Sequence, residues 1–132
     1  MINMITFTSC QSCRKAKKWM DNHGVAYQEI EFNYDEWKQL ELSREMLLKI
    51  LSLTENGTED ITSLRSASYK ELSQRGPLTM NQLIDFLLDN PKVLRRPLIY
   101  DEKRLQVGFN EDGIRQFIPK EKRRAELIAL HL

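Results

Sequence analysis

Two cysteines, Cys10 and Cys13, lie three positions apart in the stretch TSCQSCRKAKK, and they are the only cysteines in the chain. Four cations follow them, at Arg14, Lys15, Lys17 and Lys18. A Cys-x-x-Cys pair can be half of a metal site, a catalytic dithiol, or a switch that responds to oxidation. The surrounding residues indicate which of these chemistries is available here.

A metal site is the first alternative to weigh. Zinc takes four ligands, so the cysteines would need two more, and the candidates of the usual type are His23 and His131. These histidines are far apart in the sequence and lack the paired spacing of zinc modules. We therefore expect no metal at the pair and no other cofactor.

The composition narrows the class of protein and its compartment. The 132 residues carry 20 Lys and Arg against 19 Asp and Glu, a balance that argues against binding nucleic acid by bulk positive charge. No apolar run approaches the roughly 20 residues that span a bilayer, and the start MINMITFTSC lacks the length of a signal peptide. We expect a cytoplasmic protein without a membrane partner. In that reducing compartment a Cys-x-x-Cys pair without further ligands is expected to be redox-active.

The elements that position the cysteines are a strand, a helix and a second strand. Met4–Phe7 is predicted to be a buried strand, and a helix begins near Ser12 and stops at Gly24. Val25–Phe32 alternates and predicts the second strand. A strand–helix–strand unit of this length favours parallel pairing with a right-handed crossover.

The rest of the chain is predicted to be helical and then to form a hairpin. Helices are expected over residues 43–53, 63–73 and 80–90, with a break at Asn56–Gly57. Two short strands, Leu98–Tyr100 and Leu105–Val107, flank a tight turn, and Asn110 caps a helix over 111–117. The basic stretch PKEKRR follows.

This order of elements predicts an α/β fold with a thioredoxin-like mixed sheet, built from a βαβ half and a ββα half. We expect one domain over residues 1–132. Its core would comprise about 1–33 and 92–118, and the helices of about 34–91 would be inserted between the halves.

Cys10 is predicted to lie where the first strand ends and the helix begins. Unpaired backbone N–H groups and the helix dipole there favour the ionised thiol, and the following cations add positive potential. Cys13 lies about one turn further on and could close a disulfide with Cys10. The plainer interpretation is a pair of half-buried residues at a helix start, beside an exposed basic face that has Trp19 in the core behind it. The pattern also leaves open whether the disulfide is passed to a substrate or changes a binding surface.

Pro97, in the stretch LRRP, precedes a predicted strand. In thioredoxin-like folds a cis proline in this position lies against the reactive cysteine. Arg96 could then reach the Cys10 region and stabilise a thiolate or an oxyanion. The alternative is that Arg95 and Arg96 are exposed turn cations, and for Arg95 we prefer that alternative.

Three stretches carry a resemblance to a known family: TSCQSCRKAKKW, TENGTEDITSLRS and LRRPLIYDEKRLQVGFNEDGIRQFIP. Together they resemble the Spx family of transcriptional regulators, which is related in fold to arsenate reductases and glutaredoxins. The similarity extends from the first strand to about Arg124. It implies a regulator rather than an enzyme, one that binds the C-terminal domain of the RNA polymerase α subunit and changes promoter choice under thiol stress.

The resemblance also implies roles for individual residues. Gly57 matches the glycine at the polymerase contact, and Arg65 and Arg96 match arginines that support the cysteine site. Oxidation of Cys10 and Cys13 to a disulfide would be the switch. Promoter DNA would be contacted only within the polymerase complex, and the candidate contacts from the basic stretch are Lys120, Lys122, Arg123 and Arg124.

An enzyme remains the alternative interpretation: a glutaredoxin-like thiol oxidoreductase or an arsenate reductase. The related enzymes place three arginines around one cysteine, and Cys10, Arg65 and Arg96 match three of those four positions. The fourth is Phe109 here, which removes a cation from the oxyanion site and disfavours arsenate reduction. The family further implies a proteolytic adaptor and the ClpXP protease as partners, although the ending LIALHL is shorter than in many members.

Overall fold

The computed structural model describes residues 1–32, 43–63, 70–71, 74, 76 and 78–130. Its sheet has four strands in the order β2-β1-β3-β4. They are β1 (Ile2–Phe7), β2 (Tyr27–Phe32), β3 (Leu98–Tyr100) and β4 (Leu105–Val107). β1 pairs in parallel with β2 and antiparallel with β3, and β3 pairs antiparallel with β4. The predicted mixed sheet of the α/β class is confirmed.

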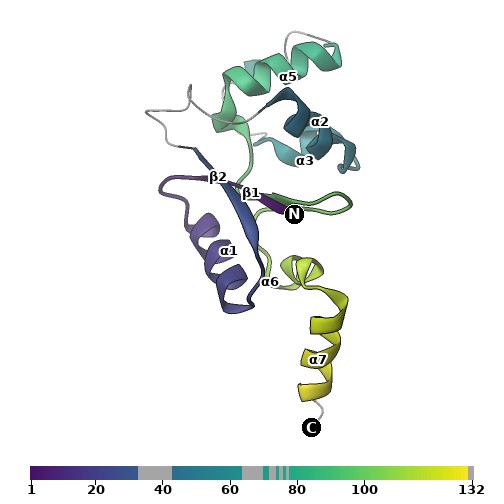
Figure 1. Cartoon of the computed structure of the whole chain (residues 1–132). Coiled ribbons are helices and arrows are strands. Elements are labelled where there is room, and N and C mark those ends of the chain that lie inside the picture. The colour runs from purple at the N-terminus through teal and green to yellow at the C-terminus, as the bar shows by residue number, and fades with distance from the viewer. Residues whose placement is uncertain (33–42, 64–69, 72–73, 75, 77, 131–132) are drawn as a thin grey trace.

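Helices cover both sides of this sheet (Figure 1). One side carries α1 (Gln11–Asn22) and α6 (Glu111–Ile114), and the other carries α2 (Arg44–Ser52), α3 (Thr58–Ile61) and α5 (Met80–Asp89). Because successive side chains of a strand point to opposite faces, β1 supplies both cores. Met4 belongs to the cluster with α1 and α6, whereas Ile5 belongs to the cluster with α2, α3 and α5.

Side-chain caps begin several helices where the sequence predicts them. Ser43 accepts a hydrogen bond from the backbone N–H of Met46, and Asn110 accepts one from Gly113. Thr79 forms a complete capping box with Gln82 at the start of α5. These contacts satisfy N–H groups that have no partner within a helix, so they define where each helix starts.

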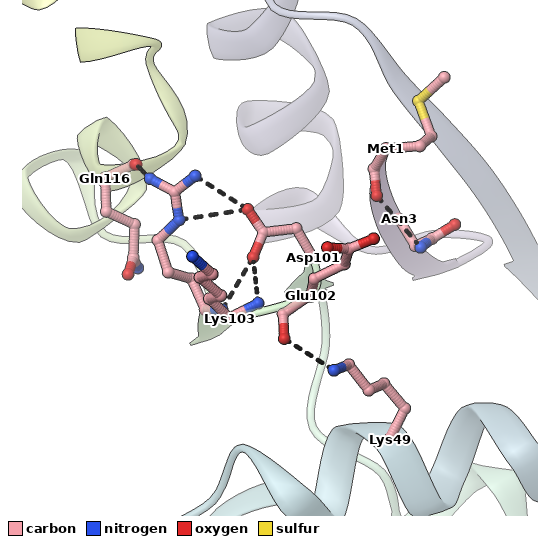
Figure 2. Close-up of polar contacts among 8 residues, drawn as sticks. Met1, Asn3, Lys49, Asp101, Glu102, Lys103 and Gln116 are labelled. Atoms are coloured by element: carbon pink, nitrogen blue, oxygen red, sulfur yellow. Dashed lines mark hydrogen bonds and ion pairs between the residues drawn. The ribbon is translucent and has the colours of Figure 1, made fainter.

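The β3–β4 hairpin is tied to neighbouring elements by polar contacts (Figure 2). Lys49 of α2 donates to the backbone carbonyl of Glu102 at 2.7 Å. Arg104 pairs with Asp101 at 3.0 Å and also donates to the carbonyl of Gln116, in the short 3-10 helix η3 (Arg115–Phe117). The hairpin therefore contacts both α2, on one side of the sheet, and the segment after α6, on the other.

Several elements differ from the sequence-based expectations. The short helix α3 follows Gly57, and α7 (Lys120–Leu130) extends from α6 away from the sheet, where only a tail was expected (Figure 1). Asn90 ends α5, and a 3-10 helix, η2 (Pro91–Val93), follows. The helix expected over 63–73 falls largely outside the described residues. Among the residues that are described, no helix is both long and apolar enough to cross a membrane.

Candidate functional site

Cys10 is the N-cap residue of α1, and its extended backbone precedes the first helical turn. The backbone N–H of Cys13 donates to the sulfur of Cys10 at 3.1 Å. The two Cα atoms are 5.2 Å apart, and the sulfurs lie within bonding distance of each other. The predicted pair therefore lies at the helix start, with the sulfur of Cys10 facing a backbone donor that would stabilise a thiolate.

The pair lies where the two cores of the molecule meet. Cys10 and Cys13 are 8% and 1% exposed and belong to the cluster that packs on α2, α3 and α5. The rest of the buried face of α1, which includes Trp19 and Met20, belongs to the opposite cluster. The first turn of α1 thus contributes to one core and the rest of the helix to the other. The cysteines therefore share a core with the helices on the other side of the sheet.

Of the four cations that follow the cysteines, Lys17 is held by another residue and does not face the cysteine pair alone. Lys17 forms an ion pair with Glu29 of β2 at 3.0 Å, and the buried Thr6 of β1 donates to the same carboxylate at 2.7 Å. Burial alone would raise the pKa of Glu29, but the hydrogen bonds from Thr6 and Lys17 outweigh it and the pKa lies below its ordinary value. Lys17 therefore holds α1 on β2.

The other three cations lie on an exposed helix surface, as the plainer interpretation expects. They are Arg14, Lys15 and Lys18.

The bond between Arg96 and Pro97 is cis, as the position before β3 predicts. The guanidinium of Arg96 lies 4.1 Å from the centre of the Phe7 ring, at the end of β1, and Nη2 donates to the carbonyl of Lys92 at 3.4 Å. Phe109 packs against the core that α1 and α6 share. Arg65, the remaining supporting arginine, lies outside the described residues.

Gly57 lies at the tip of a turn that its neighbours hold in place. The backbone N–H of Gly57 donates to Oγ1 of Thr54 at 3.1 Å, and the carboxylate of Asp60 accepts from the backbone of Glu55 and Asn56 at 2.9 and 3.0 Å. The hydrogen bonds from Asn56 hold the pKa of Asp60 below its ordinary value. Gly57 has φ +71° and ψ −136°, a conformation that L residues avoid. A Cβ built on Gly57 would meet no atom within 4 Å, so the turn presents bare backbone.

A backbone bridge joins the Gly57 turn to the segment that leads into Pro97. Arg95 N–H donates to Ile61 O at 2.8 Å and Ser63 N–H donates to Val93 O at 2.7 Å, around a pairing of Thr62 with Leu94. Sequence reasoning missed this link, because an isolated bridge has no periodic pattern. The signal available was the apolar character of Ile61 and Leu94, both of which are buried in the cluster that contains the cysteines.

The basic residues proposed for DNA lie on α7, and their environments differ. Lys120 and Arg124 are exposed. Lys122 instead donates to the backbone carbonyl of His23, at the C-terminal end of α1, where a cation complements the helix dipole. The side chain of Arg123 lies outside the described part of the structure. In that described part, no group of three or more His, Cys, Asp or Glu side chains could hold a metal ion.

Comparison with known proteins places the chain in a family. The profile of the ArsC family matches residues 6–117. A global transcriptional regulator Spx of Streptococcus mutans is 47% identical over 128 residues, covering 96% of this chain and 90% of the relative. The Spx of Lactiplantibacillus plantarum is 44% identical over 129 residues, covering 97% and 94%. An arsenate reductase from Vibrio cholerae has the same fold, with a TM-score of 0.62, 20% identity, and coverage of 89% of this chain and 94% of that one.

These comparisons decide between the two classes of function considered from the sequence. The two relatives at 44% and 47% identity are named as regulators, which confirms the prediction of a regulator rather than an enzyme, and the similarity to the reductase concerns the fold alone. The thioredoxin-like, arsenate-reductase-like fold is likewise confirmed. The chain belongs to the ArsC family and, within it, to the Spx group of global transcriptional regulators.

Proposed function

We propose that this transcriptional regulator senses oxidation through a Cys10–Cys13 disulfide and binds the C-terminal domain of the RNA polymerase α subunit through the surface around Gly57. Binding alters which promoters the polymerase uses under thiol or oxidative stress. The observation that carries the proposal is that Cys10, Cys13 and Ile61 of α3 pack in one buried cluster. A change at the pair therefore has a route through packed side chains to the turn that holds Gly57.

The Gly57 turn suits contact with another protein. Its backbone is pinned by Thr54 and Asp60, so little conformational entropy is lost when a partner binds. The absence of a side chain at Gly57 lets a partner backbone approach closely. A side chain added at this position would occupy that space, and its Cβ would meet no atom of the regulator within 4 Å.

A titration of the purified chain with the isolated C-terminal domain of the α subunit tests the partner. We expect the wild-type chain to bind and the variant Gly57→Arg to lose binding, since the guanidinium stem fills the contact. Two control variants distinguish steric blocking of the partner by the arginine side chain from backbone strain at Gly57. Gly57→Ala carries the same backbone strain, of order 1–3 kcal/mol, with only a methyl group, and we expect partial binding. Gly76→Arg places the same side chain at an exposed glycine away from the turn, where φ is +81° and a Cβ would meet no atom within 4 Å, and we expect full binding.

The redox switch is tested with the same titration and a promoter assay, in the oxidised and reduced states. We expect transcription at thiol-stress promoters to depend on oxidation in the wild type and to lose that dependence in Cys10→Ala and Cys13→Ala. Binding by Gly57→Arg at wild-type affinity would refute the polymerase contact. Equal promoter activity in both redox states would refute the switch.

The remaining parts of the proposal rest on the resemblance and on exposed charge. Lys120 and Arg124 are available for promoter phosphates once polymerase holds the regulator at DNA, whereas Lys122 is engaged with His23. Band-shift assays with and without polymerase test this. Degradation by ClpXP, with and without an adaptor, tests the proteolytic partners. A cytoplasmic location and a single domain, with the inserted helices at about 34–91, complete the proposal.

A further inference from the structure

A cleft with a volume of about 540 Å³ opens beside the Gly57 turn. Its apolar lining comes from Leu53, after α2, and from Leu105 and Val107 of β4. Leu105 and Val107 are half-buried and pack against the same cluster that contains the cysteines. The cleft is therefore bounded by the core sheet on one side and by the inserted helical segment on the other.

Charged residues line the cleft unevenly. Asp60 is hydrogen-bonded by the turn and lies close enough to Arg95 for that cation to contribute to its low pKa, so these two charges offset each other. Glu55 and Glu59 also line the cleft, and both are exposed. Within the residues that the structure describes, neither carboxylate forms an ion pair. Two uncompensated negative charges thus stand beside an apolar lining.

This combination has a specific chemical complement. Lysine and arginine carry a long aliphatic stem with a cation at its end, so the stem can pack on apolar surface while the cation reaches a carboxylate. A divalent metal is a poorer fit, because no group of three acidic, His or Cys side chains in the described ranges could hold one. The chemistry of the cleft selects a basic side chain.

We propose that this cleft receives a lysine or arginine side chain from the C-terminal domain of the polymerase α subunit, with its stem on Leu105 and Val107 and its cation at Glu55 and Glu59. The inference rests on the proposed function, because it assigns the docked partner to the same face as Gly57. It adds a recognition element that the bare backbone at Gly57 cannot supply. Gly57 permits close approach, and the cleft selects charge and fixes the orientation of the partner.

The test measures binding of the same polymerase domain to the double variant Glu55→Gln/Glu59→Gln. The matched control is Glu102→Gln/Glu111→Gln, which removes the same number of exposed carboxylates away from the cleft. Glu111 also resembles Glu59 in its place in the first turn of a four-residue helix, so effects on helix ends are balanced.

We expect the cleft variant to bind about tenfold more weakly and the control to stay within about twofold of the wild type, as befits loss of two favourable charge contacts. Raising the salt concentration should weaken wild-type binding more steeply than binding by the cleft variant. In methyl-detected NMR, the signals of Leu105 and Val107 should shift on addition of the domain.

Three results would overturn the inference: equal affinity of cleft variant and wild type, equal losses in the cleft variant and the control, or unmoved Leu105 and Val107 signals. If wild type binds and Gly57→Arg does not, any of these results removes the cleft alone and leaves the proposed function in place. If the wild-type chain does not bind the domain at all, both the proposed polymerase contact and the role of the cleft are refuted.

Discussion

At the scale of single residues, Cys10 and Cys13 have different environments. The sulfur of Cys10 faces the backbone N–H of Cys13 at the helix start, whereas Cys13 is packed inside the first turn. Cys10 is also the more exposed of the two, at 8% against 1%. We therefore expect the less buried thiol, Cys10 at the positive end of the helix, to react first, and Cys13 to resolve it into the disulfide.

Alkylation of the reduced protein tests this order. Treatment with iodoacetamide near neutral pH should modify Cys10 about tenfold faster than Cys13, because Cys10 combines better access with a stabilised thiolate. Mass spectrometry of the peptides measures both rates. The same reaction in denaturant is the control and should show similar rates. Faster modification of Cys13 in the folded protein would reverse the assignment of attacking and resolving thiols.

Glu29 makes the attachment of α1 to the sheet dependent on pH. Because its pKa in the folded state lies below the ordinary value of 4.5, the stabilisation is present above that value and is lost as the pH falls through the lower folded pKa. The wild type should therefore lose more stability between pH 7 and the acid range than Glu29→Gln does. Urea denaturation at a series of pH values measures this difference. Parallel pH profiles for the two proteins would contradict the role of Glu29.

At the scale of elements, side-chain caps set where α2, α5 and α6 begin, and burial sets where they pack. α5 illustrates both, since Thr79 and Gln82 close its capping box while Ile84 and Leu87 are buried in the cluster with the cysteines. An ion pair between Arg44 and Asp85 connects α2 and α5. The inserted helices are thus stabilised as a group on one side of the sheet.

Loss of the α5 cap should lower stability without changing the site. Thr79→Ala should reduce the free energy of unfolding by about 1 kcal/mol, because the first turn of α5 then has unsatisfied N–H groups. Thr79→Ser keeps the hydroxyl and should remain close to the wild type. Equilibrium urea unfolding gives both values. A loss in Thr79→Ser as large as that in Thr79→Ala would show that the methyl group, not the cap, is responsible.

At the scale of the whole molecule, the cysteines and the Gly57 turn share one core although they lie far apart in the sequence. The bridge between Thr62 and Leu94 joins the segment that follows the Gly57 turn to the segment that precedes the Arg96–Pro97 bond. Ile61 and Leu94, on either side of that bridge, are buried with Cys10 and Cys13. Redox chemistry at one site and binding at the other are therefore expected to be coupled.

Hydrogen exchange tests this coupling directly. Reduction of the disulfide should speed exchange at the backbone amides of residues 60–63, because the cysteines no longer constrain the cluster that supports them. Amides of α6 should change little, because its buried Ile114 belongs to the opposite cluster. The double variant Cys10→Ala/Cys13→Ala is the control and should not respond to reductant. Unchanged exchange at residues 60–63 on reduction of the wild type would show that the two sites are independent.

Much of the fold, and part of the candidate site, could be predicted from local patterns in the sequence. The alternation of β2, the caps at Ser43, Thr79 and Asn110, and the short β3–β4 turn are all readable because a strand, a helix start and a hairpin depend on neighbouring residues. The helix α3 and the long α7 were missed. α3 is too short for periodicity to show, and the first residues of α7, KEKRR, are all charged and so carry no apolar periodicity.

The sequence by itself determined the Cys-x-x-Cys pair at a helix start, the mixed sheet and, through its resemblance, the family, since each depends on residue type and spacing. Only the tertiary structure decided that Lys17 pairs with Glu29 and that Lys122 donates to the backbone carbonyl of His23. It also decided that the cysteines are buried in the cluster that contains α3 rather than in the one that contains α6. Contacts between residues distant in sequence are set by how the layers pack. The cleft beside Gly57 belongs to the same class, because its lining comes from three separate segments of the chain.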